Sequence, residues 1–218
     1  MARILCIETA TTNCSVGVAV DGKLVACRED NPQGLAGKSY SHAETLTKFI
    51  EDTLKTAQIN FNELDAVAIG MGPGSYTGLR IGVSSAKGLC MALEIPLIAI
   101  NSLEILTQSA THKADFYVPM LDARRMEAYT AVFNANKEIV KPTWAEVLTE
   151  ASFNTYLNTN KTVLFLGSAV AKYKPLCTYM QAKFQQDVLP SATGMATLAT
   201  IKYQKGDFED VAYFEPYY

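Results

Sequence analysis

Apolar and polar positions alternate along the first 28 residues in a pattern typical of β-strands. The run "RILCIE" at 3–8 and the run "CSVGVAV" after a short polar turn both read as strands. Asp21-Gly22 then separates the second run from "KLVACR". Asp-Gly between alternating apolar runs is a strong hairpin signal, so the chain is predicted to open with three strands, the last two forming a hairpin.

The spacing of apolar residues becomes helical after a loop at 30–40 that is rich in Asn, Pro and Gly. Ser41 and Glu44 have the spacing of a capping box, which marks the start of a helix. The pattern predicts a helix over 42–57 with one apolar face. That face consists of Leu46, Phe49, Ile50, Leu54 and Ala57.

A short continuous apolar run follows, "DAVAIG" at 65–70, which fits a strand buried on both faces. After a glycine-rich stretch, the pattern predicts a helix to about Leu93, a strand "PLIAI" and a further helix that opens at Asn101 or Ser102. The order β-β-β-α-β-α-β predicts an α/β fold in which helices pack on a mixed sheet.

The opening pattern returns in the second half of the chain. Residues 4–26 align with 118–140 at a constant offset of 114, which places Glu8 opposite Asp122. Two hairpins can resemble each other by chance. A duplicated domain is the better interpretation, because each copy opens one half of the chain.

We therefore expect two units, 1–105 and a smaller, degenerate unit 106–218, with C-terminal residues completing the first. A strand "TVLFLG" and helical stretches near 168–183 and 192–203 are expected to complete the second half.

Composition and charge narrow the functional classes. The chain is 49% apolar and 19% charged, as in an ordinary globular protein, with a net charge of −3 and no basic run longer than Arg124-Arg125. Strong unaided binding to nucleic acid is therefore not expected. The apolar stretch before Glu8 is too short for a signal peptide, and no apolar run approaches the ~20 residues of a membrane span. We expect a cytoplasmic protein, with its five cysteines reduced because none has C-x-x-C spacing.

The stretch "GMGPGSYTGLRIG" at 70–82 does not match the known glycine-rich motifs. It lacks the lysine of a phosphate-binding P-loop and the G-x-G-x-x-G spacing of a dinucleotide fold. It also lacks the G-x-S-x-G of a nucleophile elbow. We expect Gly74 and Gly78 to turn the chain sharply from a buried strand into a helix. Gly70 and Gly72 suit a positive φ or a close approach of backbone.

Five segments carry a resemblance to a known family. They are "ILCIETATTNCSV", "SHAETL", "GMGPGSYTGLRIGVSSAKGL", "DARRMEAY" and the closing "FEPYY", whose tyrosines are similar to the family's end strand. Together they resemble the TsaB (YeaZ) family over nearly the whole chain. These proteins are bacterial accessory subunits of the machinery that makes threonylcarbamoyladenosine in tRNA. Members commonly continue a few residues beyond the last tyrosines.

The resemblance implies the duplicated actin-like, ribonuclease-H-like fold of sugar kinases, actin and heat-shock ATPases. It implies a subunit that binds and activates a related catalytic partner, TsaD, as a heterodimer and performs no transfer itself. A TsaE-type ATPase component is a further implied partner. A homodimer is possible when the subunit is alone, and tRNA is reached only through the complex.

The residues support a chain without its own catalytic, cofactor or metal site. Kinase-type relatives carry an acid and a glycine-rich turn in the first hairpin, but the turn after Glu8 has no glycine. The second hairpin has Asp122 followed by Arg124 and Arg125, again without a glycine pair, and Gly167 stands alone where nucleotide-binding relatives have two glycines. The catalytic partner's metal motif H-x-x-x-H is also incomplete, since residue 46, four after His42, is a leucine, so His42 and His112 are expected to be structural or solvated.

Small residues form two stripes on the helix after the glycine stretch. Gly78, Gly82 and Ala86 make one; Ser85, Gly88 and Ala92 make the other. Each interior glycine costs a helix ~1 kcal/mol relative to alanine, so close packing must compensate. Internal packing is the plain interpretation, and partner docking by this helix and the 42–57 helix is the functional one.

We expect the partner interface to include residues from both helices: Leu79, Gly82, Val83, Ala86, Leu46 and Ile50. Arg80 lies near the helix start, where the macrodipole disfavours a cation, so it is expected to meet a carboxylate.

Three functional classes follow. The first is a non-catalytic scaffold and activator of tRNA threonylcarbamoylation. The second is an active ATPase or small-molecule kinase of the same fold, which the missing glycines argue against. The third is a protease, which no H-E-x-x-H motif, nucleophile elbow or local Cys–His signature supports.

Overall fold

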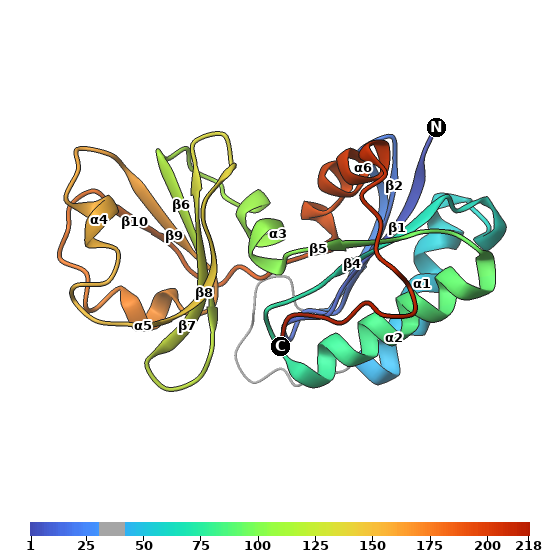
Figure 1. Cartoon of the computed structure of the whole chain (residues 1–218), viewed down its shortest axis with the longest axis horizontal. Helices are drawn as coiled ribbons and strands as arrows, with labels where there is room; N and C mark the ends of the chain where they lie inside the picture. The colour runs from blue at the N-terminus through green and yellow to red at the C-terminus, as the bar shows by residue number, and fades with distance from the viewer. Residues whose placement is uncertain (31–41) are drawn as a thin grey trace.

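The computed structural model describes residues 1–30 and 42–218, and it contains two five-stranded sheets that lie side by side (Figure 1). The predicted loop at 30–40 and the predicted cap Ser41 lie almost entirely outside the described residues. The first sheet has the order β3-β2-β1-β4-β5. Its strands are β1 (Arg3–Glu8), β2 (Ser15–Val20), β3 (Lys23–Glu29), β4 (Ala66–Gly70) and β5 (Leu97–Ile100).

Helices cover both faces of the first sheet, and together they form the first lobe. Helices α1 (His42–Ala57) and α2 (Tyr76–Leu93) pack on one face and bury one hydrophobic core there. Helix α6 (Ala196–Lys205) and the preceding single turn η2 (Ala192–Gly194) cover the other face and bury a second core. A second short turn, η1 (Phe61–Glu63), leads into β4.

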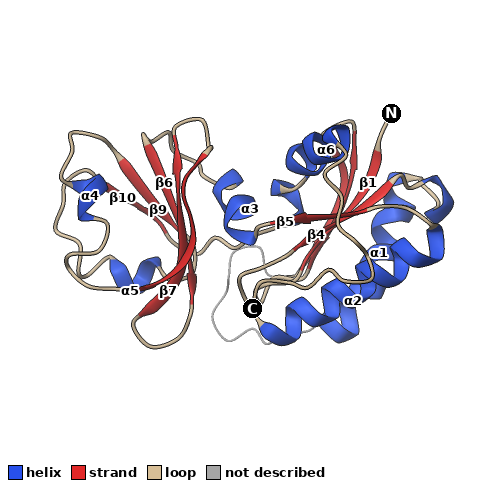
Figure 2. Ribbon diagram, in the orientation of Figure 1, coloured by secondary structure: helices blue, strands red, loops and turns tan. Residues whose placement is uncertain are grey.

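The second lobe is built on a sheet of order β10-β9-β6-β7-β8. Helix α3 (Ser102–Gln108) covers the face that looks toward the first lobe, as Figure 2 shows. The single turns α4 (Asn154–Leu157) and α5 (Val170–Tyr173) cover the other face. The strands are β6 (Phe116–Asp122), β7 (Glu127–Asn134), β8 (Ile139–Val147), β9 (Val163–Leu166) and β10 (Ala182–Gln185).

The two sheets repeat one topology, as the internal alignment predicted. In each, three antiparallel strands (β1-β2-β3 and β6-β7-β8) are followed by two parallel ones, β4-β5 and β9-β10. Glu8 ends β1, and Asp122 ends β6 at the equivalent position. Asp21 and Gly22 turn the first hairpin with φ of 48° and 80°, the left-handed geometry that Asp-Gly favours. This is the duplicated actin-like fold of two mixed sheets with flanking helices.

The second half of the chain differs from the prediction in one place. The prediction of a helical stretch near 168–183 is wrong, because the helix α5 stops at Tyr173 and β10 begins at Ala182. Pro175 favours the early end, because proline has no backbone N–H with which to continue the helical hydrogen bonds. The expected helix near 192–203 exists, but its first turn is η2 and α6 runs to Lys205. The division at residue 105 stays a prediction, and it falls inside α3.

The last ten residues, 209–218, form a C-terminal segment that returns across the first lobe. Glu209 N–H donates to Leu97 O at the edge of β5 (2.9 Å), and Tyr217 N–H donates to Met71 O (2.8 Å). Between them, Phe214 is buried in the core under α1 and α2. The closing tyrosines therefore run beside the sheet without forming a named strand of it.

We predict that Val83→Arg will destabilise the fold strongly, because Val83 on α2 is only 6% exposed and packs in the core between α2 and the sheet. An unpaired charge forced into such a core costs several kcal/mol, so we expect a loss of at least ~3 kcal/mol in the free energy of unfolding. Ser84→Arg is the matched control, since Ser84 is exposed one residue further on. Urea unfolding of both variants checks the prediction, and equal stability of the two would contradict it.

Candidate functional site

The turn that follows β1 lies against a buried carboxyl group. Glu8 ends β1 and is fully buried. Its two oxygens accept hydrogen bonds from Ala10 N–H (2.7 Å) and from the hydroxyl of Ser102 at the start of α3 (2.9 Å). Gly70 lies against the same carboxylate, and any side chain there would overlap it. The turn's own N–H thus donates to a carboxyl oxygen supplied by the chain.

The glycine-rich stretch closes over this turn, which answers why its glycines are needed. A Cβ at Gly74 would overlap the carbonyl of Ala10, and one at Gly78 would overlap the carbonyl of Thr9. Ser75 N–H donates to Ala10 O (2.6 Å), and the Thr9 hydroxyl donates to Gly78 O (2.9 Å). The close approach of backbone was predicted for Gly70 and Gly72. It extends to Gly74 and Gly78, which pack the loop directly onto the turn.

Gly72 alone of these glycines has a positive φ, +93°. Its Cβ position faces the carbonyl of Tyr217, so a side chain there would push the C-terminal segment away. The Gly72–Pro73 peptide bond is cis, and Ser102 N–H donates to Gly72 O (2.8 Å). The loop therefore contacts the first turn, α3 and the C-terminal segment at once.

His42, at the start of α1, completes the enclosure of the turn. It is buried, and its Nε2 donates to Thr11 O (2.7 Å). Burial lowers the pKa of its imidazole, which favours the neutral ring. His112 is exposed in the loop after α3. Among the residues that the structure describes, no group of three His, Cys, Asp or Glu side chains could hold a metal ion.

The equivalent turn of the second lobe is held differently. Asp122 accepts a hydrogen bond from Arg124 N–H (2.6 Å) and forms an ion pair with Lys172 of α5. Arg124 and Arg125 take positive φ values of 69° and 42° and are exposed, so two long side chains occupy positions where glycine is usual. Gly167 (φ +117°) faces the carbonyl of Met120, within its own sheet.

The six residues predicted for a partner interface are all buried by contacts within this chain. Leu46, Ile50, Leu79, Val83 and Ala86 are at most 6% exposed, and Gly82 is buried against Thr9 and Ile69. The stripe of Gly78, Gly82 and Ala86 therefore serves internal packing. An interface at these two helices stays a prediction. On α2, the residues available for such an interface are those on the side that faces away from the sheet.

That other side of α2 carries small residues and few large ones. Ser84, Gly88 and Ala92 are exposed, Ser85 is half-buried, and a Cβ at Gly88 would meet no atom within 4 Å. Met91 is 71% exposed at the end of the same side. We call this set the outer face of α2. Nothing within the chain requires glycine at position 88, although glycine costs the helix ~1 kcal/mol relative to alanine.

Arg80, in the first turns of α2, was expected to meet a carboxylate, and none of the described carboxylates lies within ion-pair distance of it. Its guanidinium lies instead over the ring of Tyr76 (4.3 Å to the centroid), with the ring of Tyr218 at 6.0 Å. The helical spacing of Tyr76 and Arg80 could have indicated the first contact, whereas Tyr218 is too distant in sequence for its contact to be predicted.

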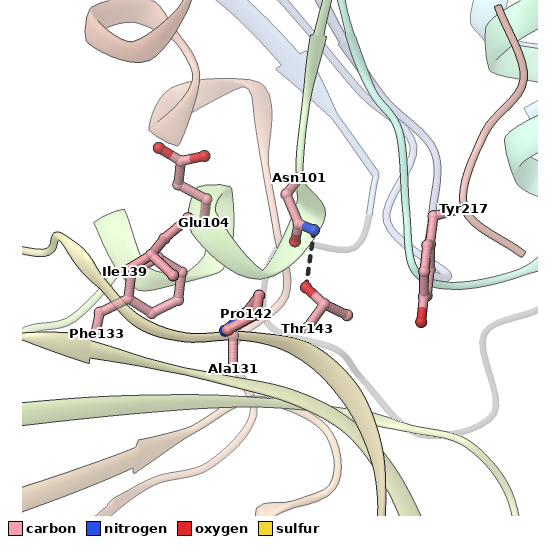
Figure 3. Close-up of a pocket in the computed structure, with 8 residues that line it drawn as sticks. All are labelled: Asn101, Glu104, Ala131, Phe133, Ile139, Pro142, Thr143 and Tyr217. Carbon is pink, nitrogen blue, oxygen red and sulfur yellow. Dashed lines mark hydrogen bonds between the residues drawn. The ribbon is translucent and has the colours of Figure 1, made fainter.

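A cavity of about 280 Å³ lies between the lobes (Figure 3). A hydrogen bond from Asn101 Nδ2 to Thr143 Oγ1 (2.9 Å) crosses from one lobe to the other at its edge. Most of the lining is apolar. The lining residues are Asn101, Glu104, Ala131, Phe133, Ile139, Pro142, Thr143 and Tyr217.

Burial raises the pKa of the Glu8 carboxyl from the ordinary 4.5 to about 7, against the opposing effect of its hydrogen bonds to Ala10 and Ser102. A pKa raised by folding stabilises the protein fully below pH 4.5, and this contribution is lost as pH rises through 7. At 1.36 kcal/mol per unit, the loss is about 3 kcal/mol.

We therefore predict that Glu8→Gln removes this part of the pH dependence. A glutamine can accept from Ala10 N–H and donate to the Ser102 hydroxyl, so it fits the same site without a charge. The free energy of unfolding, measured in urea at pH 5, 6, 7 and 8, should fall by about 3 kcal/mol more for the natural protein than for the variant. Parallel curves would show that Glu8 is not buried as a titrating group.

No helix among the described residues combines the length and apolar character that crossing a membrane requires. A family model described as "TsaD: tRNA N6-adenosine threonylcarbamoyltransferase" matches residues 37–214. The solved structure "YeaZ from Pseudomonas aeruginosa" superposes with a TM-score of 0.83 at 25% identity and covers 100% of both chains.

Two curated relatives carry the name "tRNA threonylcarbamoyladenosine biosynthesis protein TsaB". The Escherichia coli (strain K12) protein is 35% identical over 137 residues, which are 62% of this chain and 56% of that protein. The Haemophilus influenzae protein is 28% identical over 229 aligned positions, which cover 99% of this chain and 92% of that protein. The chain therefore belongs to the family of TsaD, tRNA N6-adenosine threonylcarbamoyltransferase, and within it to the TsaB (YeaZ) group that its motifs resemble.

Proposed function

We propose that this chain is a non-catalytic subunit of the tRNA threonylcarbamoyladenosine machinery, and that it binds and activates a TsaD-type catalytic subunit. The observation that carries the non-catalytic part is the occupied first turn. The Glu8 carboxylate takes the N–H of Ala10 that would face a phosphate, and Gly70, Gly74 and Gly78 bring the chain's own backbone onto the turn. A nucleotide would have to displace this whole arrangement.

The second turn supports the same conclusion. Arg124 and Arg125 occupy its tip, and Asp122 is paired with Lys172. A carboxylate that forms an ion pair with a lysine of its own chain is less available to bind a magnesium ion. The competing function, an active ATPase or small-molecule kinase of this fold, would require both turns to rearrange.

The family relation itself supports pairing with a TsaD-type partner. Because this chain matches the TsaD model, the partner shares its fold and presents a related pair of helices. Two related surfaces can pair around a pseudo-twofold axis, and the same surface can pair with a second copy when the partner is absent. We propose the outer face of α2, with the exposed side of α1, as the surface that meets the partner.

The net charge of −3 gives this chain few means of holding a phosphate backbone. We therefore propose that tRNA binds through the complex, with the catalytic subunit making most phosphate contacts. A TsaE-type ATPase would join the same assembly. The chain would then act by stabilising the competent arrangement of the partner's lobes, which is a shift of the partner's conformational populations.

We predict that product forms only in the complete mixture. Nucleoside mass spectrometry would measure threonylcarbamoyladenosine in tRNA incubated with an activated threonylcarbamoyl donor. The chain alone should give no product, the catalytic subunit alone little, and both with the ATPase component should turn over. Thr9→Ala should reduce turnover only slightly, since its hydroxyl bonds to Gly78 O within the chain. Product from this chain alone, or loss of turnover in Thr9→Ala with partner binding intact, would refute the non-catalytic role.

We also predict that Gly88→Trp weakens binding to the catalytic subunit while the protein stays folded. Gly88 is exposed with open space at its Cβ position, so the fold tolerates a large side chain, whereas a closely packed partner does not. Overpacking and steric exclusion at a well-packed contact typically cost ~1–3 kcal/mol, or about tenfold to a hundredfold in affinity.

Gln204→Trp, on the exposed side of α6, is the matched control and should bind normally. Titration calorimetry with the purified partner makes the comparison. Equal affinity of the two variants would move the interface away from α2.

A further inference from the structure

Arg80 has a fixed position on the surface although its side chain is exposed. Its guanidinium carbon lies 4.3 Å from the ring centroid of Tyr76, one helical turn earlier on α2. The ring of Tyr218 lies 4.7 Å from that of Tyr76 and 6.0 Å from the guanidinium. One tyrosine ring from the same helix and one from the C-terminal segment thus lie beside this arginine.

The C-terminal segment is held in place by contacts other than Tyr218. Lys87 Nζ, two turns along α2, donates to the carbonyls of Ala212 (3.1 Å) and Phe214 (3.2 Å). Phe214 is buried in the first lobe, and Tyr217 N–H is bonded to Met71 O. The segment therefore runs along α2 (Figure 1), and its last ring is placed at Arg80 by the fold.

The charge of Arg80 has no anionic counterpart within the chain. It lies near the N-terminus of α2, where the helix dipole is positive and disfavours a cation. No described carboxylate is within ion-pair distance of it, and residues 31–41 contain no Asp or Glu. The cost of a cation at this place is therefore not offset by any ion pair of the chain itself.

We propose that Arg80 anchors the docking surface for the catalytic subunit and receives a carboxylate from it. This inference rests on the proposed function and names the chemistry of the contact. A guanidinium is planar and matches a carboxylate with two parallel hydrogen bonds. Arginine and tyrosine are the residues enriched where interfaces concentrate their binding energy. Arg80, Tyr76 and Tyr218 form such a cluster.

The neighbouring surface fits the same partner. Ser84 follows Arg80 by one helical turn and Gly88 by two, so small side chains continue the surface along the outer face of α2. A partner helix can approach there closely enough for an acidic side chain on it to reach Arg80. The flanking rings limit the motion of the guanidinium before binding, which reduces the entropy lost on docking.

The test measures affinity for the purified catalytic subunit by calorimetry at two salt concentrations. Arg80→Ala should bind at least tenfold more weakly than the natural chain, and Arg80→Glu more weakly still. Arg80→Lys should stay impaired, because lysine keeps the charge but loses the planar fork. The charge-matched control is Lys183→Ala, which removes an exposed cation from β10 in the second lobe and should bind normally. Tyr218→Ala should lose affinity to a smaller degree, by releasing the guanidinium.

A charge-reversal experiment identifies the carboxylate of the partner. Changing the Asp or Glu that contacts Arg80 to Arg should restore the partner's binding to the Arg80→Glu variant. Undiminished affinity of a folded Arg80→Glu variant would overturn the proposal. So would a change in self-association or in tRNA binding alone, since these would assign Arg80 to a second copy or to RNA. Failure of the natural chain to bind the catalytic subunit at all would instead refute the proposed function, so the two failures are distinguishable.

Discussion

The first lobe is organised around one buried acid, the carboxyl group of Glu8. It connects three elements that are distant in sequence: its own turn through Ala10 N–H, β4 through its contact with Gly70, and α3 through the Ser102 hydroxyl. Taking a carboxylate out of water is costly, and the raised pKa of this group records that cost. Glycine at position 70 follows directly, because any side chain there would occupy the space of the carboxylate.

Close packing on the same turn explains why the two sides of the α2 helix differ in their contacts. Its inner side must approach the turn so closely that Gly78 and Gly82 face the backbone and hydroxyl of Thr9. Its outer side has no such demand from the chain, yet Gly88 is there as well. The contacts of the fold explain glycine at positions 78 and 82, and they do not explain Gly88. The internal contacts of α2 are therefore distinct from those proposed for a partner.

Much of the fold could be read from the sequence, because its signals are local. Asp21-Gly22 specified its hairpin turn, and the spacing from Leu46 to Leu54 specified the buried face of α1. The prediction failed at 168–183, where α5 has only one turn before Pro175 and β10 depends on pairing with β9, a non-local contact. At the site, the missing glycines were visible in the sequence. The buried placement of Val83 and the position of Tyr218 beside Arg80 were not, because each depends on tertiary contacts between segments that are distant in sequence.

The order of elements in the first lobe also affects how the chain can fold during synthesis. All strands of the second sheet lie between Phe116 and Gln185, whereas the first sheet is covered by α6 and the C-terminal segment, which come last. Domains generally fold from the N-terminus as they leave the ribosome, but here the N-terminal sheet must wait for the end of the chain. The second lobe can therefore complete its core earlier. Until α6 emerges, one face of the first sheet stays uncovered, and nascent chains of this protein should be most prone to aggregation at that stage.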